Sequence, residues 1–290
     1  MSSPASPPSP GGTTTTTGSN HANTQSHNSS NNNDDNNQQH YTTYLTSPTH
    51  PLTLHNLSPS PSSPDPAIMA SLLSSPPDGP LDAAWARGAI TRQRAAAAVP
   101  TVTVPPSSSS YAAATPAGVI SGPKRCDLGI YLLLDDDGSN NSSGTHGRRR
   151  ETLIGLSGYG SIKQSHPSAS AEADRRPRRV GDAGVLLADG HRGKGYAAEA
   201  MRLSLDLAAA PASEGGLQLD AVSVTTLEDN VAMRSLAERR LGLGEGVLRP
   251  AEFDNNKREV YWEISTAEWR RRTEAQQGPA EVESSRSKQE

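Results

Sequence analysis

The stretch from Val180 to Ala208 constrains the fold more than any other part of the sequence. Val180–Ala188 is a mostly apolar segment of strand length, and a glycine-rich turn follows it. After the turn, Ala197, Met201 and Leu205 recur at the spacing of one face of a helix. The polar residues Glu199, Arg202 and Asp206 fall on the opposite face. The sequence therefore predicts a strand, a turn and an amphipathic helix.

The surrounding segments predict an α/β (α+β) fold, in which helices flank a mixed, mostly antiparallel central sheet. Three strands, at 128–134, 152–163 and 180–188, are joined by polar loops without helices and should form an antiparallel meander. Before them we expect a short strand from Leu52 and two helices, 67–73 capped by Asp65 and 82–98 with Trp85 on its buried side. After the helix at 197–208 we expect a strand at 219–225, a helix that begins at Asn230, and strands at 246–249 and 259–264.

Composition predicts one folded domain, residues 48–270, between two tails. Residues 1–47 consist largely of Ser, Thr, Asn, Gln, Pro and Gly. Such a segment cannot bury enough apolar surface to offset its ordering entropy, so we expect it to be disordered. Residues 271–290 are expected to form a second, charged disordered tail, and polar inserts are expected near 138–150 and 164–179.

Composition also excludes several classes of protein. The single cysteine, Cys126, excludes an internal disulfide framework, and the histidines near the start show no metal-ligand spacing, so we expect no metal. No apolar run approaches the ~18 residues that a membrane span needs, so no membrane partner is expected. The net charge of -4 gives no general attraction to nucleic acid. Because no Lys or Arg precedes Arg87, we expect no signal peptide and a cytoplasmic location, and a nuclear location is not excluded.

The turn after Val180–Ala188 suits a phosphate group. Glycines and a helix N-terminus expose several backbone N–H groups, and Arg192 and Lys194 add positive charge. A Walker A loop is ruled out, because Gly195 stands where that motif needs Ser or Thr. The dinucleotide pattern G-x-G-x-x-A matches at 193–198, but its usual parallel βαβ setting is missing. A surface turn without any ligand is the remaining alternative.

The six residues from Arg192 to Ala197, Arg-Gly-Lys-Gly-Tyr-Ala, resemble the Q/R-x-x-G-x-G/A acetyl-CoA signature of the GNAT superfamily of N-acetyltransferases. The flanking residues, Leu-Leu-Ala-Asp-Gly-His before the motif and Ala-Glu-Ala-Met after it, resemble the ribosomal-protein-alanine N-acetyltransferase-like group within that superfamily. The expected order of strands and helices over roughly residues 51–270 is also the order of the GNAT fold. The resemblance implies acetyl-CoA as cosubstrate.

The resemblance also implies which residues hold the cosubstrate. The backbone of Val185, Leu186 and Leu187 would lie along the pantetheine arm. Asn230 matches a family asparagine that contacts the coenzyme, although helix capping explains this residue equally well. Met233 stands where the related group often has serine, so no role of that serine is assigned. The residues expected to wrap the diphosphate are Arg192, Gly193, Lys194, Gly195, Tyr196 and Ala197.

The implied function is transfer of an acetyl group from acetyl-CoA to a primary amine, either a protein N-terminus or a small molecule, by direct attack. Asp182 and Glu228 are candidates for the general base and Tyr261 for the proton donor, although a solvated or structural side chain is the more common case for each. The alternative is a catalytically weak or inactive GNAT-like protein that binds coenzyme A or docks partners. The sequence does not identify the acceptor.

Overall fold

The fold is taken from a computed structural model of the 290-residue chain, and the structure describes residues 43–74, 81–103, 119–134, 150–165 and 178–277. The described residues exclude 1–42 of the tail predicted at 1–47, 278–290 of the tail predicted at 271–290, and most of the two predicted inserts. The described residues include the whole of the predicted strand, turn and helix at 180–208.

An eight-stranded sheet forms the centre of the molecule, with the strand order β1-β2-β5-β6-β7-β8-β10-β9. All neighbouring strands are antiparallel except β7 and β8, which are parallel. β3 (Val102–Thr103) and β4 (Val119–Ser121) pair separately as a small second sheet. The strands of the central sheet are β1 (Tyr44–Thr46), β2 (Leu52–His55), β5 (Cys126–Leu134), β6 (Arg150–Ser165), β7 (Arg178–Leu187), β8 (Ala221–Leu227), β9 (Val247–Ala251) and β10 (Asp254–Ser265).

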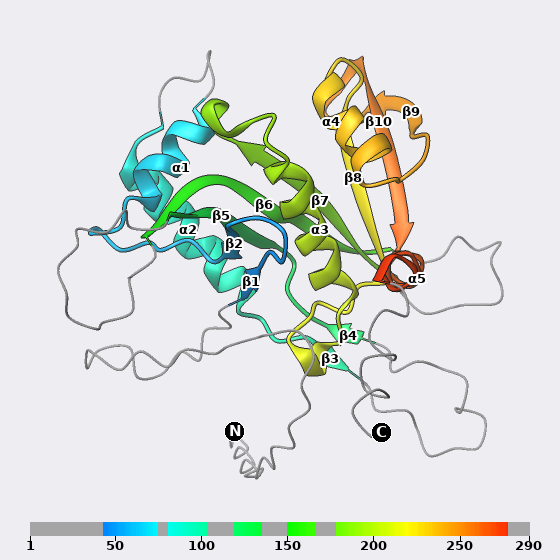
Figure 1. Ribbon diagram of the computed structural model, residues 1–290, viewed down its shortest axis with the longest axis horizontal. Coiled ribbons are helices and arrows are strands. Elements are labelled where there is room, and N and C mark those ends of the chain that lie inside the picture. Colours follow the sequence, from blue (N-terminus) through cyan, green and yellow to red (C-terminus); the bar gives the residue numbers. More distant parts are fainter. Residues whose placement is uncertain (1–42, 75–80, 104–118, 135–149, 166–177, 278–290) are drawn as a thin grey trace, which may run out of the picture.

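Helices cover both faces of this sheet. Figure 1 shows α3 in front of the sheet and α2 behind it. A π-helical turn, Leu236–Arg240, continues α4 without a break. The helices are α1 (Asp65–Leu73), α2 (Ala83–Ala97), α3 (Tyr196–Ala209), α4 (Val231–Ser235) and α5 (Thr266–Gln277), with short 3-10 turns at Asp189–His191 and Ala212–Glu214.

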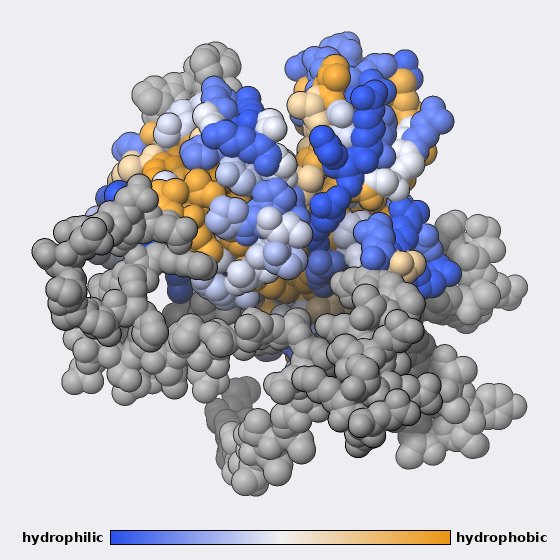
Figure 2. Space-filling model, in the orientation of Figure 1, coloured by the Kyte–Doolittle hydropathy of each residue, from blue (hydrophilic) through white to orange (hydrophobic). Residues whose placement is uncertain are grey.

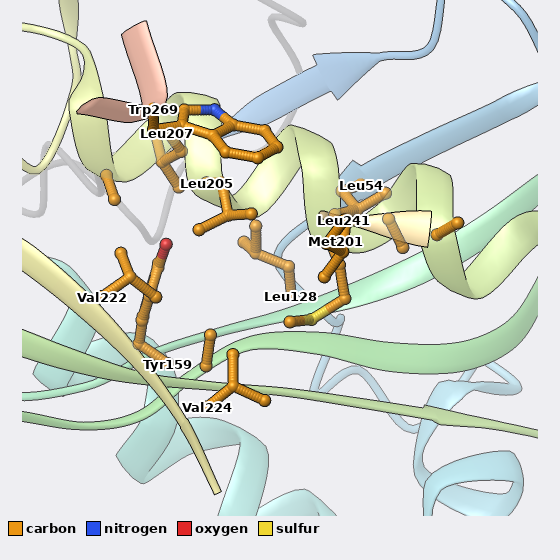
Figure 3. Close-up of a cluster of buried hydrophobic side chains, with 14 of the residues drawn as sticks. Leu54, Leu128, Tyr159, Met201, Leu205, Leu207, Val222, Val224, Leu241 and Trp269 are labelled. Carbon is orange, nitrogen blue, oxygen red and sulfur yellow. The ribbon is translucent and has the colours of Figure 1, made fainter. Parts of the chain in front are cut away.

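Two hydrophobic clusters hold the layers together, one on each face of the sheet. On the first face, Met201 and Leu205 of α3 pack against sheet residues such as Val222 and Val224, and Trp269 of α5 closes the cluster (Figure 3). On the other face, α1 and α2 form a smaller cluster with Tyr131 and Leu153. Because successive side chains of a strand point to opposite faces, these clusters define the face to which each neighbouring residue points.

The parallel pair β7 and β8 is the feature that shapes the site. Their pairing runs only from Val180 opposite Ala221 to Ala183 opposite Val224. Beyond it, β7 continues to Leu187 and β8 to Leu227 without pairing to each other. The two strands therefore lie side by side near α5 and separate toward α4 (Figure 1).

The strands and helices predicted from hydrophobic pattern are present, including the antiparallel meander β5-β6-β7. Both predicted tails include residues that belong to the folded part of the structure. β1 lies inside the tail predicted at 1–47, and it is ordered because it pairs with β2 from Tyr44 to Thr46. α5 enters the tail predicted at 271–290, because Trp269 buries its ring in the core and anchors the helix.

Some predicted side-chain positions were wrong. Asp65 does not cap α1, because its Oδ2 accepts hydrogen bonds from the Ser58 N–H at 2.8 Å and the Tyr131 hydroxyl at 2.6 Å. Trp85, predicted on the buried side of α2, is 43% exposed. Ile90 and Ala86, which were predicted on the same side of this helix, are buried.

Two acidic residues of α3 were placed on its polar face but are held by distant partners. Glu199 is only 4% exposed, and its Oε1 accepts a 2.6 Å hydrogen bond from the Ser47 hydroxyl. The Asp206 carboxylate accepts a 2.7 Å hydrogen bond from Nε1 of Trp269. In the part of the chain that the structure describes, no helix is both long and apolar enough to cross a membrane.

Candidate functional site

The turn between β7 and α3 is built to expose backbone N–H groups. Gly193 and Gly195 have φ of 76° and 86°, a left-handed conformation that glycine adopts without strain. The first backbone donor that bonds into the helix is Glu199, whose N–H reaches the Gly195 carbonyl at 3.2 Å. The preceding N–H groups at the start of α3 therefore have no acceptor within the helix, and an anion can bind them.

Positive charge surrounds this turn. The Arg192 side chain is held in place because Nε donates to the Leu187 carbonyl at 3.1 Å and Nη1 pairs with Asp189 at 2.9 Å. Lys194 is exposed on the same turn. The positive end of the α3 dipole adds to both charges.

A cleft of about 580 Å³ opens beside the turn, on the face of the sheet that carries α3 and α4. One wall is the end of β7, from Gly184 to Leu187, together with the turn, and the other wall is α4 with the π-helical turn. Thr225 and Thr226 of β8 lie between the walls. Figure 2 shows the hollow between the body that carries α1 to α3 and the arm of α4 and β8 to β10.

Most of the residues predicted to hold the coenzyme lie around this cleft. Lys194 and Tyr196 belong to the turn but do not line the cleft. The Tyr196 ring packs edge-on against the His50 ring, with 5.9 Å between the two ring centroids. The cleft also includes residues that the sequence did not single out, among them Thr226, Ser235 and Arg240. The predicted residues that line it are Val185, Leu186, Leu187, Arg192, Gly193, Gly195, Ala197 and Asn230.

Asn230 caps α4 and also lines the cleft. Its Oδ1 accepts from the Met233 N–H at 3.1 Å, and its Nδ2 donates to the Thr226 hydroxyl at 2.9 Å. Both helix capping and contact with a ligand in the cleft are therefore compatible with the position of Asn230.

A second cleft, of about 460 Å³, lies on the opposite face of the sheet. Ala183 and Val224 belong to the core on the α3 face, so Asp182 and Thr225 point to the other side. The two clefts share Thr225 and Thr226, the residues of β8 just beyond the last pair with β7. They therefore approach each other where the two strands separate.

Asp182 lies on the floor of this second cleft. Burial raises the pKa of its carboxyl, and a nearby charge, Glu252, raises it further. The hydrogen bond from the Ser223 hydroxyl, at 3.3 Å, and the charge of Lys163 lower the pKa and offset part of this effect. A carboxylate with a raised pKa is a stronger base than an ordinary aspartate.

Tyr261 faces the same cleft from β10, opposite Thr225. Burial and the neighbouring Glu263 raise the pKa of its phenol to about 12. The hydroxyl therefore carries a proton at neutral pH and donates it in a hydrogen bond to Glu263. The Arg249 guanidinium lies 4.2 Å from the centre of the Tyr261 ring.

Glu228, the third residue predicted to take part in catalysis, lies apart from Asp182 and Tyr261. It lines a separate depression with Arg234 and Glu238, and its carboxylate is 3.9 Å from Arg258. The structure thus brings together two of the three candidates.

Residues 126–243 match a family model described as acetyltransferase (GNAT) domain. A comparison with curated proteins found no match.

Solved structures with a similar fold include an acetyltransferase of the GNAT family from Bacillus anthracis, at 12% identity and TM-score 0.43, with 78% of this chain and 100% of that chain covered. Another is Mycobacterium smegmatis RimJ in complex with CoA-disulfide, at 15% identity and TM-score 0.46, with 78% and 88% covered. A third is a chimera of spermidine N-acetyltransferase SpeG from Vibrio cholerae and hSSAT, at 16% identity and TM-score 0.43, with 76% and 98% covered. These identities and TM-scores carry no information about the acceptor of this chain.

Proposed function

We propose that this chain, in which residues 126–243 match the acetyltransferase (GNAT) domain, transfers an acetyl group from acetyl-CoA to a primary amine. The observation that carries the proposal is the pair of clefts on opposite faces of the sheet, which share Thr225 and Thr226 where β7 and β8 separate. One cleft would hold the coenzyme and the other the acceptor, so that the two reactants meet through the split in the sheet.

The cleft beside α3 has the groups that the coenzyme needs. Its diphosphate would bind the N–H groups at the start of α3, with Arg192 and Lys194 as the nearest cations. The backbone of Val185–Leu187 has no pairing strand on the β8 side and would bond the amide groups of the pantetheine arm. His191 lies beside the turn, and its buried Nδ1 has no hydrogen-bond partner in the described structure. This nitrogen is therefore free to form a hydrogen bond with the coenzyme.

The opposite cleft suits an amine acceptor because most of its charged side chains are acidic. Four carboxylates face two cations, Lys163 and Arg249, although Arg178 outside the cleft also pairs with Glu263 at 3.0 Å. Such a lining attracts an ammonium group and repels an acceptor that carries a carboxylate. The four carboxylates are Asp182, Glu252, Glu259 and Glu263.

In the proposed reaction the amine nitrogen attacks the thioester carbonyl carbon, the carbon–sulfur bond breaks, and the amide and free coenzyme thiol form. An ammonium must first lose a proton, which costs about 1 kcal/mol at pH 7 for an α-amino group and roughly 4.6 kcal/mol for a lysine-type amine. Asp182 would accept this proton. The Tyr261 hydroxyl would protonate the departing thiolate and regain a proton from the attacking nitrogen, which loses its second proton as the amide forms. A strand N–H near Leu186 or Leu187 would bond the oxyanion. We assign no step to Glu228.

Release of free thiol from acetyl-CoA by the full chain, with a panel of primary amines, tests the proposal. Thiol should appear only with an amine present, and Asp182→Asn should slow it while binding of acetyl-CoA is unchanged. Glu214→Gln is the control, because this carboxylate is exposed and lines neither cleft. Binding of acetyl-CoA without thiol release for any amine would favour the alternative, a protein that binds coenzyme A without turnover.

A further inference from the structure

Arg240 lies on the wall of the coenzyme cleft that faces the glycine turn, and none of the groups assigned above uses it. It is the last residue of the π-helical turn Leu236–Arg240. In this turn the N–H of Leu241 bonds to the carbonyl of Leu236 at 3.0 Å, five residues back. Single π-turns of this kind are rare and occur frequently at functional sites.

The two neighbouring arginines at the end of the π-turn have different surroundings. Leu236 and Leu241 are buried in the core and fix the orientation of the turn, while Arg239 and Arg240 are both exposed. Only Arg240 of these two lines the cleft. Arg202 of α3 donates from Nη2 to the Arg240 carbonyl at 3.1 Å, which ties the end of the turn to the helix that follows the glycine loop.

The side chain of Arg240 is available for an anion. Among the described residues, no ion pair involves Arg240, whereas Arg192 on the facing wall pairs with Asp189. A guanidinium that lines a cleft and has no carboxylate partner is suited to a phosphate group, because its planar donors match two phosphate oxygens.

We propose that Arg240 binds the phosphate on the 3′ position of the coenzyme's ribose, and this inference rests on the proposed function. Coenzyme A has two separate anionic groups, the diphosphate in the middle of the molecule and the 3′-phosphate on the adenosine end. The glycine turn, Arg192 and Lys194 account for the diphosphate. Arg240 stands on the opposite wall of the same cleft and provides a separate cation for the second group.

Calorimetric titration of the full chain with coenzyme A and with 3′-dephospho-coenzyme A tests this assignment without any measurement of activity. In Arg240→Gln we expect Kd for coenzyme A to rise about tenfold, the size expected for loss of one charge-assisted hydrogen-bonding pair. Kd for the 3′-dephospho form should change little. Arg239→Gln is the matched control and should leave both constants unchanged, and Arg240→Lys should lie between the two.

Three results would overturn the inference. An equal loss of affinity for both ligands in Arg240→Gln would mean that Arg240 serves the diphosphate. No loss for either ligand would mean that it does not contact the coenzyme. If the unchanged chain binds neither ligand, the proposed function itself fails and this inference falls with it. Thermal unfolding of each variant would show whether the fold is intact.

Discussion

Replacing Gly195 by alanine tests whether the glycine turn must keep its left-handed conformation. A non-glycine residue at φ of 86° costs about 1–2 kcal/mol. The new methyl group would also lie 3.1 Å from Nε2 of His50, closer than ordinary van der Waals contact. If the turn keeps its shape, the cost lowers the free energy of unfolding. If the turn relaxes, the cost appears on binding and weakens coenzyme affinity by up to about thirtyfold.

Two other glycines of the same segment provide the matched controls. Gly193 has φ of 76° but open space around its Cβ position, so Gly193→Ala should cost the strain without the contact. Gly190 has open space and no left-handed φ, so Gly190→Ala should be neutral or slightly stabilising. Urea unfolding and calorimetric titration with coenzyme A measure the two parts of the cost. Equal behaviour of all three variants in both assays would refute the reasoning.

Three further predictions concern other parts of the structure. Because burial raises the pKa of Asp182, the folded state binds its proton more tightly than the unfolded state, and stability should fall as pH rises from the ordinary carboxyl range through this raised pKa. Asp182→Asn should remove that fall in urea unfolding and flatten the acidic limb of kcat/KM; an unchanged rate profile would exclude Asp182 as the base. Ser47→Ala should cost about 1–3 kcal/mol in urea unfolding, because the buried Glu199 carboxylate loses a donor, and a loss no larger than that of an exposed serine would contradict this. Trp269→Phe removes the hydrogen bond to Asp206, so Tm should fall by roughly 2–4 °C for each kcal/mol of unfolding free energy that this bond contributes. An unchanged Tm would mean that the bond contributes nothing.

Features specified by nearby residues could be predicted from the sequence. The Asp82 side chain accepts from the Trp85 N–H at 2.7 Å, and α2 begins there as expected. The strands of the meander and the turn before α3 were also located correctly, because hydrophobic period and glycine placement are local signals.

Features that depend on distant residues could not be predicted. The buried Glu199 carboxylate accepts its hydrogen bond from Ser47, which lies 152 positions away in the sequence. The Asp206 carboxylate accepts its hydrogen bond from Trp269, which lies 63 positions away. α5 has a polar composition, and it docks through the buried Trp269 and through hydrogen bonds to distant residues, such as the one from Arg270 to the Ala209 carbonyl.

The proposed acceptor cleft combines side chains from five strands, β6 to β10, and from the hairpin at Glu252. Asp182 and Tyr261 were identified as separate candidates, and only the pairing of β7, β8 and β10 places them on one face. The role proposed for Arg240 also depends on the π-turn, which leaves no clear signal in the sequence.

Amide hydrogen exchange of the full chain, with and without coenzyme A, tests the central claim most directly. The account predicts slower exchange in two places, the N–H groups at 193–198 and the unpaired edge of β7 at 184–187, with little change at Asp82 and Trp85 of α2. The account would be contradicted if coenzyme A left the exchange rates at 193–198 unchanged, or if it slowed exchange only at residues outside the cleft.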